Sequence, residues 1–250
     1  MVRTAQRYWV CLLVCALAVS VAIWPYVTQR AVANTPAAVD QQLSLITYNP
    51  PNRGAPGRTA DGGSRRCAEL VALQPGRTHW GETTDAHPTF WISVSGAADS
   101  LTLTLADEYS KESFYQTAFA PTATPGIGRY TLPYGAPALA VDTPYRWTVS
   151  LTCPMTDSQP EVSGVIVRRV MSATLQADLS EAAPRDRIVL LAADGLWYNA
   201  LNELAELRLA NADDETLAAD WATLLQHTQS EDGAEQIMDK PLLEEYPNRL

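Results

Sequence analysis

The chain has 250 residues, of which 46% are hydrophobic, and a formal net charge of −10. A chain of this length and composition can bury its own core, as one large domain or two small ones. Its acidic balance repels nucleic acid and anionic lipid, which excludes both as partners for the bulk of the surface. The first 33 residues hold three arginines and no acid, so their removal lowers the net charge to −13.

The N-terminus has the pattern of an export signal. Two arginines precede an apolar run over residues 8–23, and residues 31–33 have the small-x-small form of a signal-peptidase site. We therefore predict a signal peptide over residues 1–33 and a periplasmic or secreted protein. The alternative is a membrane anchor, because residues 8–27 match the ~20 residues that a membrane helix needs.

Export leaves two cysteines in the remaining chain, Cys67 and Cys153. Two lone thiols in an oxidising compartment most often pair, so we predict a disulfide between them. Closing so long a loop would stabilise the fold by roughly 4 to 5 kcal/mol on the chain-entropy estimate. Two buried free cysteines are the alternative.

Residues 34–48 are rich in Ala, Gln, Ser and Thr, and we interpret them as a flexible tether. The next stretch, 49–67, is dense in Arg, Gly and Pro, which predicts an extended, turning clasp loop rather than a helix or strand. Four of its residues are candidates for binding an anion or a partner: Arg53, Arg58, Arg65 and Arg66. We favour the structural alternative, in which the loop lies across the sandwich and these arginines pair with surface acids such as Asp107 or Glu108.

Short apolar runs recur about every ten residues between positions 68 and 171. Seven of them are predicted strands: 70–73, 89–94, 101–105, 114–119, 128–132, 145–151 and 162–170. Pro, Gly and Asp separate these runs. The pattern predicts an antiparallel β-sandwich of about seven strands, of the immunoglobulin or fibronectin III kind.

Two features of these strands place individual side chains. Tyr145 opens a strand six residues after Leu139, which resembles the tyrosine corner of such sandwiches, where the hydroxyl bonds to the upstream backbone. Alternation puts Trp147 and Cys153 on the inward side. The same alternation places Trp91 on the outward face of its strand, where we expect another element to cover it.

Beyond residue 172 the apolar period becomes that of helices. Four helices are predicted: 175–182, 184–194, 196–210 and 214–226. We expect them to form an α-helical hairpin or small bundle over residues 172–250, which caps the sandwich and covers Trp91. The tail, 241–250, is expected to add one helical turn.

No group of side chains predicts catalysis. One cluster has the residue types of a metal site: His79, Glu82, Asp85 and His87. Its spacing matches no zinc motif, so we interpret these as solvated loop residues. Neither a G-x-S-x-G nor an HExxH motif occurs, and the adjacent Asp107 and Glu108 would point to opposite faces of a strand. We therefore favour a non-enzymatic protein without a cofactor.

Two tryptophans leave a sugar-binding function open. Trp80 and Trp91, together with Tyr109, would form an aromatic platform, whereas core packing or contact with a helix is the alternative for the tryptophans. Sugar binding would fit a protein of the cell wall or exopolysaccharide, either glycan-binding or glycan-processing.

Several motifs together resemble a known family. They are RGAPGRTADGGSR at 53–65, Cys67, HPTFW at 87–91, PGI at 125–127, the strand from Tyr145 to Cys153, and GLWYNAL at 195–201. This set is similar to a family of exported cyanobacterial proteins catalogued as domain of unknown function 928. The resemblance spans residues 49 to about 225. It implies an exported, envelope-associated protein, and it transfers no catalytic residue.

We therefore expect an exported, non-enzymatic protein that binds an unidentified envelope protein. The glycan-binding or glycan-processing reading is the alternative.

Overall fold

The computed structural model describes residues 46–52, 68–76, 79–96, 98–122, 124–154, 159–228 and 237–246. Outside these ranges lie the predicted signal peptide, the four arginines of the clasp loop and Cys67. Their predictions therefore stay predictions. No helix in the described ranges is long and apolar enough to cross a membrane.

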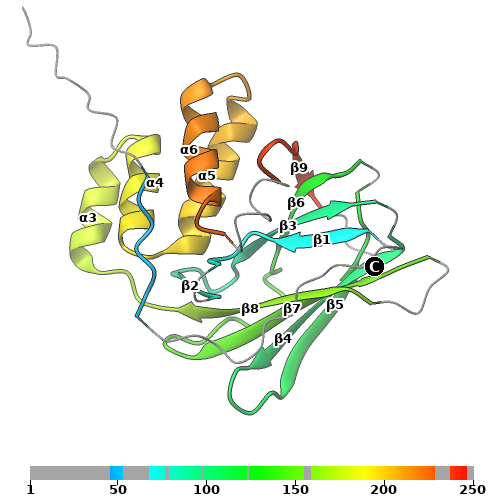
Figure 1. Cartoon of the computed structure of the whole chain (residues 1–250). Helices are drawn as coiled ribbons and strands as arrows, with labels where there is room; N and C mark the ends of the chain where they lie inside the picture. The colour runs from blue at the N-terminus through cyan, green and yellow to red at the C-terminus, as the bar shows by residue number, and fades with distance from the viewer. Residues whose placement is uncertain are drawn as a thin grey trace, which may run out of the picture. The chain divides into compact units, whose positions relative to one another are not determined.

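Nine strands in the described ranges form two sheets (Figure 1). The smaller sheet has the order β1 (Glu69–Ala72), β3 (Thr89–Ser95), β6 (Gly126–Thr131) and β9 (Leu242–Glu245). The larger sheet has the order β2 (Trp80–Thr83), β8 (Glu161–Arg168), β7 (Pro144–Thr152), β4 (Ser100–Asp107) and β5 (Ser113–Phe119). The β2–β8 and β6–β9 pairs are parallel, and the other pairs are antiparallel.

The prediction of about seven strands missed two of the nine. Each predicted apolar run contains a strand, but β2 lies in a segment interpreted as loop, and β9 lies where a helical turn was expected. Both have only four residues and pair in parallel with a strand far away in the sequence. Such short segments become strands through that pairing and not through a local pattern.

The core lies between the two sheets. Leu101, Leu103 and Leu105 of β4 are fully buried and alternate with half-buried threonines. Aromatic side chains from the two sheets pack against each other in this core. The ring centroids of Phe90 of β3 and Trp147 of β7 are 5.5 Å apart. Burying one such side chain stabilises the fold by about 1.5 to 3 kcal/mol. The packing makes the chain a β-sandwich.

The tyrosine corner is present. The hydroxyl of Tyr145 accepts a hydrogen bond from the backbone N–H of Ala140 at 3.3 Å, and Leu139 is fully buried beside it. Asp142, in the turn between them, has a φ of 56° and donates its N–H to the carbonyl of Arg168 at 2.7 Å. The corner thereby ties the start of β7 to the end of β8.

Four helices follow the strands: α3 (Ala173–Glu181), α4 (Pro184–Ala193), α5 (Trp197–Ala210) and α6 (Glu215–Leu225). Ser172 and Asp214 cap α3 and α6 by accepting backbone N–H groups of the first turn, and Pro184 begins α4. Gly195, with a φ of 82°, makes the turn between α4 and α5. Figure 1 shows the helices on one side of the sheets, with β4 and β5 on the side away from them.

Helix α5 covers Trp91, as predicted. The indole N–H of Trp91 donates to Asn202 Oδ1 of α5 at 3.2 Å, and the guanidinium of Arg129 lies 5.9 Å from its ring. Tyr198, also on α5, accepts a hydrogen bond from the indole N–H of Trp147 at 2.7 Å. The helices are therefore bonded to both sheets of the sandwich.

The last residues of the segment before the clasp loop belong to the core. Ile46 and Tyr48 are buried, and the Tyr48 ring packs edge-on against Trp197 at 4.8 Å. Asn49 donates its backbone N–H to Ala192 and its side-chain amide to Ala193, at the end of α4. The predicted tether, 34–48, is therefore wrong at residues 46–48, because two alternating apolar side chains dock against the helices.

Candidate functional site

The two sheets end in four edge strands, β1, β9, β2 and β5, in the part of the chain that the structure describes. Edge strands invite pairing with other chains unless they are covered or carry charge. All four residues of β2 are buried. The strands β1 and β9 carry acids, including Glu69 and Glu245. Three of the four edges are thus covered or charged.

The fourth edge, β5, is neither covered by another described strand nor charged. Its sequence, SFYQTAF, has no charged residue and no proline over seven positions. Tyr115 and Phe119 point inward, where Phe119 stacks on Tyr130 of β6 at 4.7 Å. Phe114, Gln116 and Ala118 are exposed on the other face. Among the described strands, β5 pairs only with β4. Every second residue of β5 therefore points its backbone N–H and C=O away from the sheet.

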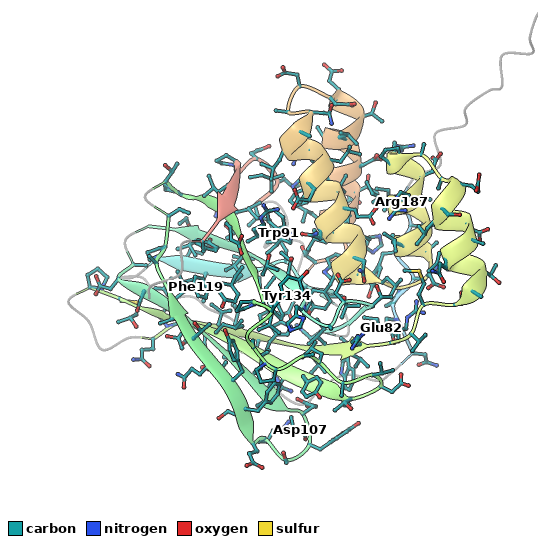
Figure 2. The ribbon with its side chains drawn as sticks, turned by 180° about the vertical axis from the view of Figure 1, so that it is seen from behind. Glu82, Trp91, Asp107, Phe119, Tyr134 and Arg187 are labelled. Atoms are coloured by element: carbon teal, nitrogen blue, oxygen red, sulfur yellow. The ribbon has the colours of Figure 1, made fainter. Side chains whose placement is uncertain are left out.

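Charged contacts fix the hairpin that leads into β5. Glu108 accepts two hydrogen bonds from Arg146, both of 2.8 Å. It also forms an ion pair with Lys111 at 3.0 Å. Burial alone would raise the pKa of Glu108, but the bonds from Arg146 and Lys111 outweigh it and lower that pKa below its usual value of 4.5. Asp107 accepts the backbone N–H groups of the turn at 2.9 and 2.8 Å. Figure 2 shows Asp107 at the end of the molecule away from the helices.

This hairpin also exposes aromatic side chains. Tyr109 is 76% exposed and Phe114 is 37% exposed, and Phe114 packs against Tyr145 with ring centroids 5.1 Å apart. Exposed aromatic rings next to an open strand edge are typical of protein-binding surfaces. We refer to β5, residues 113–119, together with Tyr109 of the hairpin as the β5 edge.

A second feature is a pocket of about 580 Å³ between α5, α6 and residues 238–242. Arg208 of α5 and Trp221 of α6 both line it, and the guanidinium lies 5.2 Å from the indole ring. The Nη1 of Arg208 and the indole N–H of Trp221 are buried donors without a hydrogen-bond partner among the residues that the structure describes. Burial lowers the pKa of Arg208, but a guanidinium stays protonated in proteins.

Arg208 differs from the other arginines of the described ranges. Five of those bind acids: Arg129 with Glu206, Arg146 with Glu108, Arg169 with Glu82, Arg185 with Asp220, and Arg187 with Glu203. Arg168 donates to the carbonyl oxygens of Thr84 and Leu139. Arg208 has neither an acid nor a carbonyl among the described residues.

The clasp-loop predictions fall outside the described residues. This holds for Arg53, Arg58, Arg65 and Arg66, so their role as an anion or partner site remains a prediction. Cys153 follows β7 and is buried, as expected of an inward position. Its pairing with Cys67 is also still a prediction.

Trp80 and Trp91 do not form an exposed platform. Trp91 is 2% exposed beneath α5, and Trp80 is 8% exposed and packs with Val165 and Val167 of β8. Neither ring face is therefore open to a sugar. The alternative of core packing and helix contact describes both.

The four residues considered as a metal site, His79, Glu82, Asp85 and His87, do not form one. Glu82 is buried on β2 and pairs with Arg169 at 2.8 Å, so its interpretation as a solvated loop residue was wrong (Figure 2). Asp85 accepts a hydrogen bond from Asn199 at 3.0 Å, and His87 bonds through Nε2 to the carbonyl of Ala136 at 3.2 Å. No three His, Cys, Asp or Glu side chains of the described ranges are grouped to hold a metal ion.

The sequence matches the profile of the family Domain of Unknown Function (DUF928) over residues 53–242. The chain belongs to this family. Most of the DUF928 match lies in described residues, and it includes both the β5 edge and the two pocket helices. No curated protein matches the chain.

Solved structures resemble the DUF928 chain only weakly. An engineered protein is 14% identical, with a TM-score of 0.30 and coverage of 41% of this chain and 20% of its own. The fn3 domain of human collagen alpha-1(XX) is 16% identical, with a TM-score of 0.26 and coverage of 47% and 94%. A CARDB domain from Pyrococcus furiosus, solved with di-metal ions, is 7% identical, with a TM-score of 0.25 and coverage of 44% and 100%.

Proposed function

We propose that this DUF928 protein is an exported, non-enzymatic envelope protein that binds another protein through its β5 edge. The supporting observation is the open edge itself: seven residues without charge or proline, in a chain of net charge −10 whose other described edges are covered or acidic. A partner strand laid along β5 would take up the free backbone groups by β-augmentation.

The side chains of the β5 edge would add selectivity to the backbone bonds. Each main-chain hydrogen bond contributes about 0.5 to 1.5 kcal/mol net. Phe114, Gln116 and Ala118 offer an apolar, a polar and a small contact on the exposed face, and Tyr109 extends this surface at the hairpin. The partner is then a protein with an extended, largely uncharged segment.

Export is the second part of the proposal. It rests on the N-terminal pattern over residues 1–33 and on the two cysteines of the remaining chain. The proposed Cys67–Cys153 disulfide would attach the clasp loop to the end of β7, which runs next to β4. Cyanobacterial origin is part of the same proposal and rests on the motif resemblance.

A glycan-binding function is less well supported, because the two indoles that suggested it are covered. Phe114 and Tyr109 are exposed, but they lie beside an open strand edge, which favours a polypeptide.

The test is a pull-down from envelope extract after chemical crosslinking. The wild-type protein should retain a specific partner, and the double variant Gln116→Lys/Ala118→Lys should lose it, because two added charges oppose strand pairing. The matched control is Gln176→Lys/Ala177→Lys, which makes the same changes on the exposed face of α3.

The control should retain the partner as the wild type does. Two outcomes would contradict the proposal: no specific protein in repeated experiments, or a partner that the edge variant still retains.

A further inference from the structure

We infer that the pocket between α5, α6 and residues 238–242 binds a small molecule with a single carboxylate and an apolar body. Its volume of about 580 Å³ falls within the roughly 300 to 1,000 Å³ of small-molecule sites. The lining is apolar apart from a few groups, and it includes Leu209, Ala218, Ala222, Met238, Pro241 and Leu242.

Two arginines contact α6, and only one of them is paired with an acid in the described ranges. The other identifies the anionic end of the ligand. Arg185 binds Asp220 of α6 through Nε at 2.6 Å and Nη2 at 2.9 Å, and Asp220 is buried. At the next position Arg208 meets Trp221, whose ring offers no carboxylate. Arg208 is only partly buried, but its Nη1 is a buried donor without an acceptor among the described residues, which is unfavourable, so an anion from outside completes the site.

The donors present suit a carboxylate. Arg208 supplies a planar guanidinium, and Trp221 supplies an indole N–H, and neither has an acceptor among the described residues. A carboxylate has two oxygens that accept such bonds side by side. The Arg208 side chain is only partly buried and lines the pocket, so a ligand bound there can reach its guanidinium.

The remaining charges of the pocket favour one negative charge over two. Lys240 is engaged by Ser93 Oγ at 3.2 Å and lies 3.9 Å from Glu69. Asp239 also lines the pocket and would repel a dianion such as a phosphate monoester. Arg208 is thus left as the charge available to a ligand. This site is formed by α5, α6 and residues 238–242, which do not include the β5 edge, and it does not depend on the proposed function.

The test is isothermal titration of the purified protein with octanoate as the probe. We expect saturable binding at one site. Arg208→Gln should weaken it at least tenfold, and Arg208→Lys should weaken it less. The control Arg187→Gln removes an arginine that is already paired with Glu203, and it should leave octanoate affinity unchanged. Octanol and inorganic phosphate, which each supply one half of the ligand chemistry, should bind at least tenfold more weakly.

Several results would overturn the inference. They are no saturable binding of octanoate, equal affinity in Arg208→Gln, or equal affinity for octanol. Circular dichroism checks that the variants fold. Should Arg208→Gln unfold, the indole N–H resonance of Trp221, assigned with Trp221→Phe, decides the question in the wild-type protein: it should shift during octanoate titration, and a resonance that does not move contradicts the site. The Gln116→Lys/Ala118→Lys variant should bind octanoate normally, so failure here and failure of the β5 edge are separate results.

Discussion

The two edge strands of the larger sheet, β2 and β5, differ in how far other residues cover them. At one end, β2 is buried along its whole length, and α5 packs so closely that a Cβ added at Gly81 would lie 2.5 Å from the Tyr198 ring. At the other end, β5 has four exposed side chains and no charge. Among the described residues, one edge of this sheet is therefore covered and the other is not, which is why we propose β5 as the binding edge.

The largest expected loss of stability comes from a substitution in the covered strand, β2. Gly81→Ala forces its new methyl group into Tyr198, which is itself held by Trp147, so the free energy of unfolding should fall by about 1 to 3 kcal/mol. The matched change on the open edge, Ala118→Val, should alter it by less than about 0.5 kcal/mol. Urea denaturation of both variants measures the contrast. Equal losses would mean that the two ends are not packed differently.

The next effect concerns the hairpin that leads into β5. Glu108→Gln replaces the carboxylate that Arg146 and Lys111 bind, and we expect a loss of about 1 to 2 kcal/mol at pH 7. Because the pKa of Glu108 is lowered in the folded state, its stabilisation is present above its usual value of 4.5 and is lost as the pH falls through the lowered pKa.

The difference in unfolding free energy between wild type and Glu108→Gln should therefore shrink as the pH drops below 4.5. Denaturation midpoints at pH 7, 5 and 3 test this. A difference that stays constant or grows on acidification would show that the carboxylate is not stabilised by its charge.

The smallest expected effect is on stability at the open edge itself. Gln116→Lys/Ala118→Lys places charges at exposed positions, so unfolding free energy should change by less than about 0.5 kcal/mol. Hydrogen exchange should show faster amides in β5 than in the central strand β7 in the free protein. A strongly destabilised double variant would mean that β5 is covered by something, and its loss of binding would then be a folding effect.

The sequence predicted the strands that form the centre of the sandwich and missed those at its borders. In β4 and β7, five or more alternating residues fix both the strand and its buried face, as Leu103 and Trp147 show. The four residues of β2 were predicted as a loop because they have no local strand pattern. They form a strand by pairing with β8, where the partner of Trp80 is Val165. The tyrosine corner was predictable because its spacing is local.

The binding features depend on long-range arrangement. The uncharged sequence of β5 is visible from the start, but its edge position follows only from the strand order. Arg208 has acids nearby in the sequence, yet Glu203 and Glu206 of the same helix bind Arg187 and Arg129 instead. Which arginine is left without an acid is therefore decided by tertiary packing, and no local pattern indicates it.

The most direct test of the β5 edge is site-specific photocrosslinking in intact cells, with a photoreactive residue in place of Gln116 and, as control, Gln176 on α3. Our account predicts an adduct with one envelope protein from position 116 and none from position 176. No adduct at position 116, or the same adduct from both positions, would contradict the claim that β5 is the docking edge of this protein.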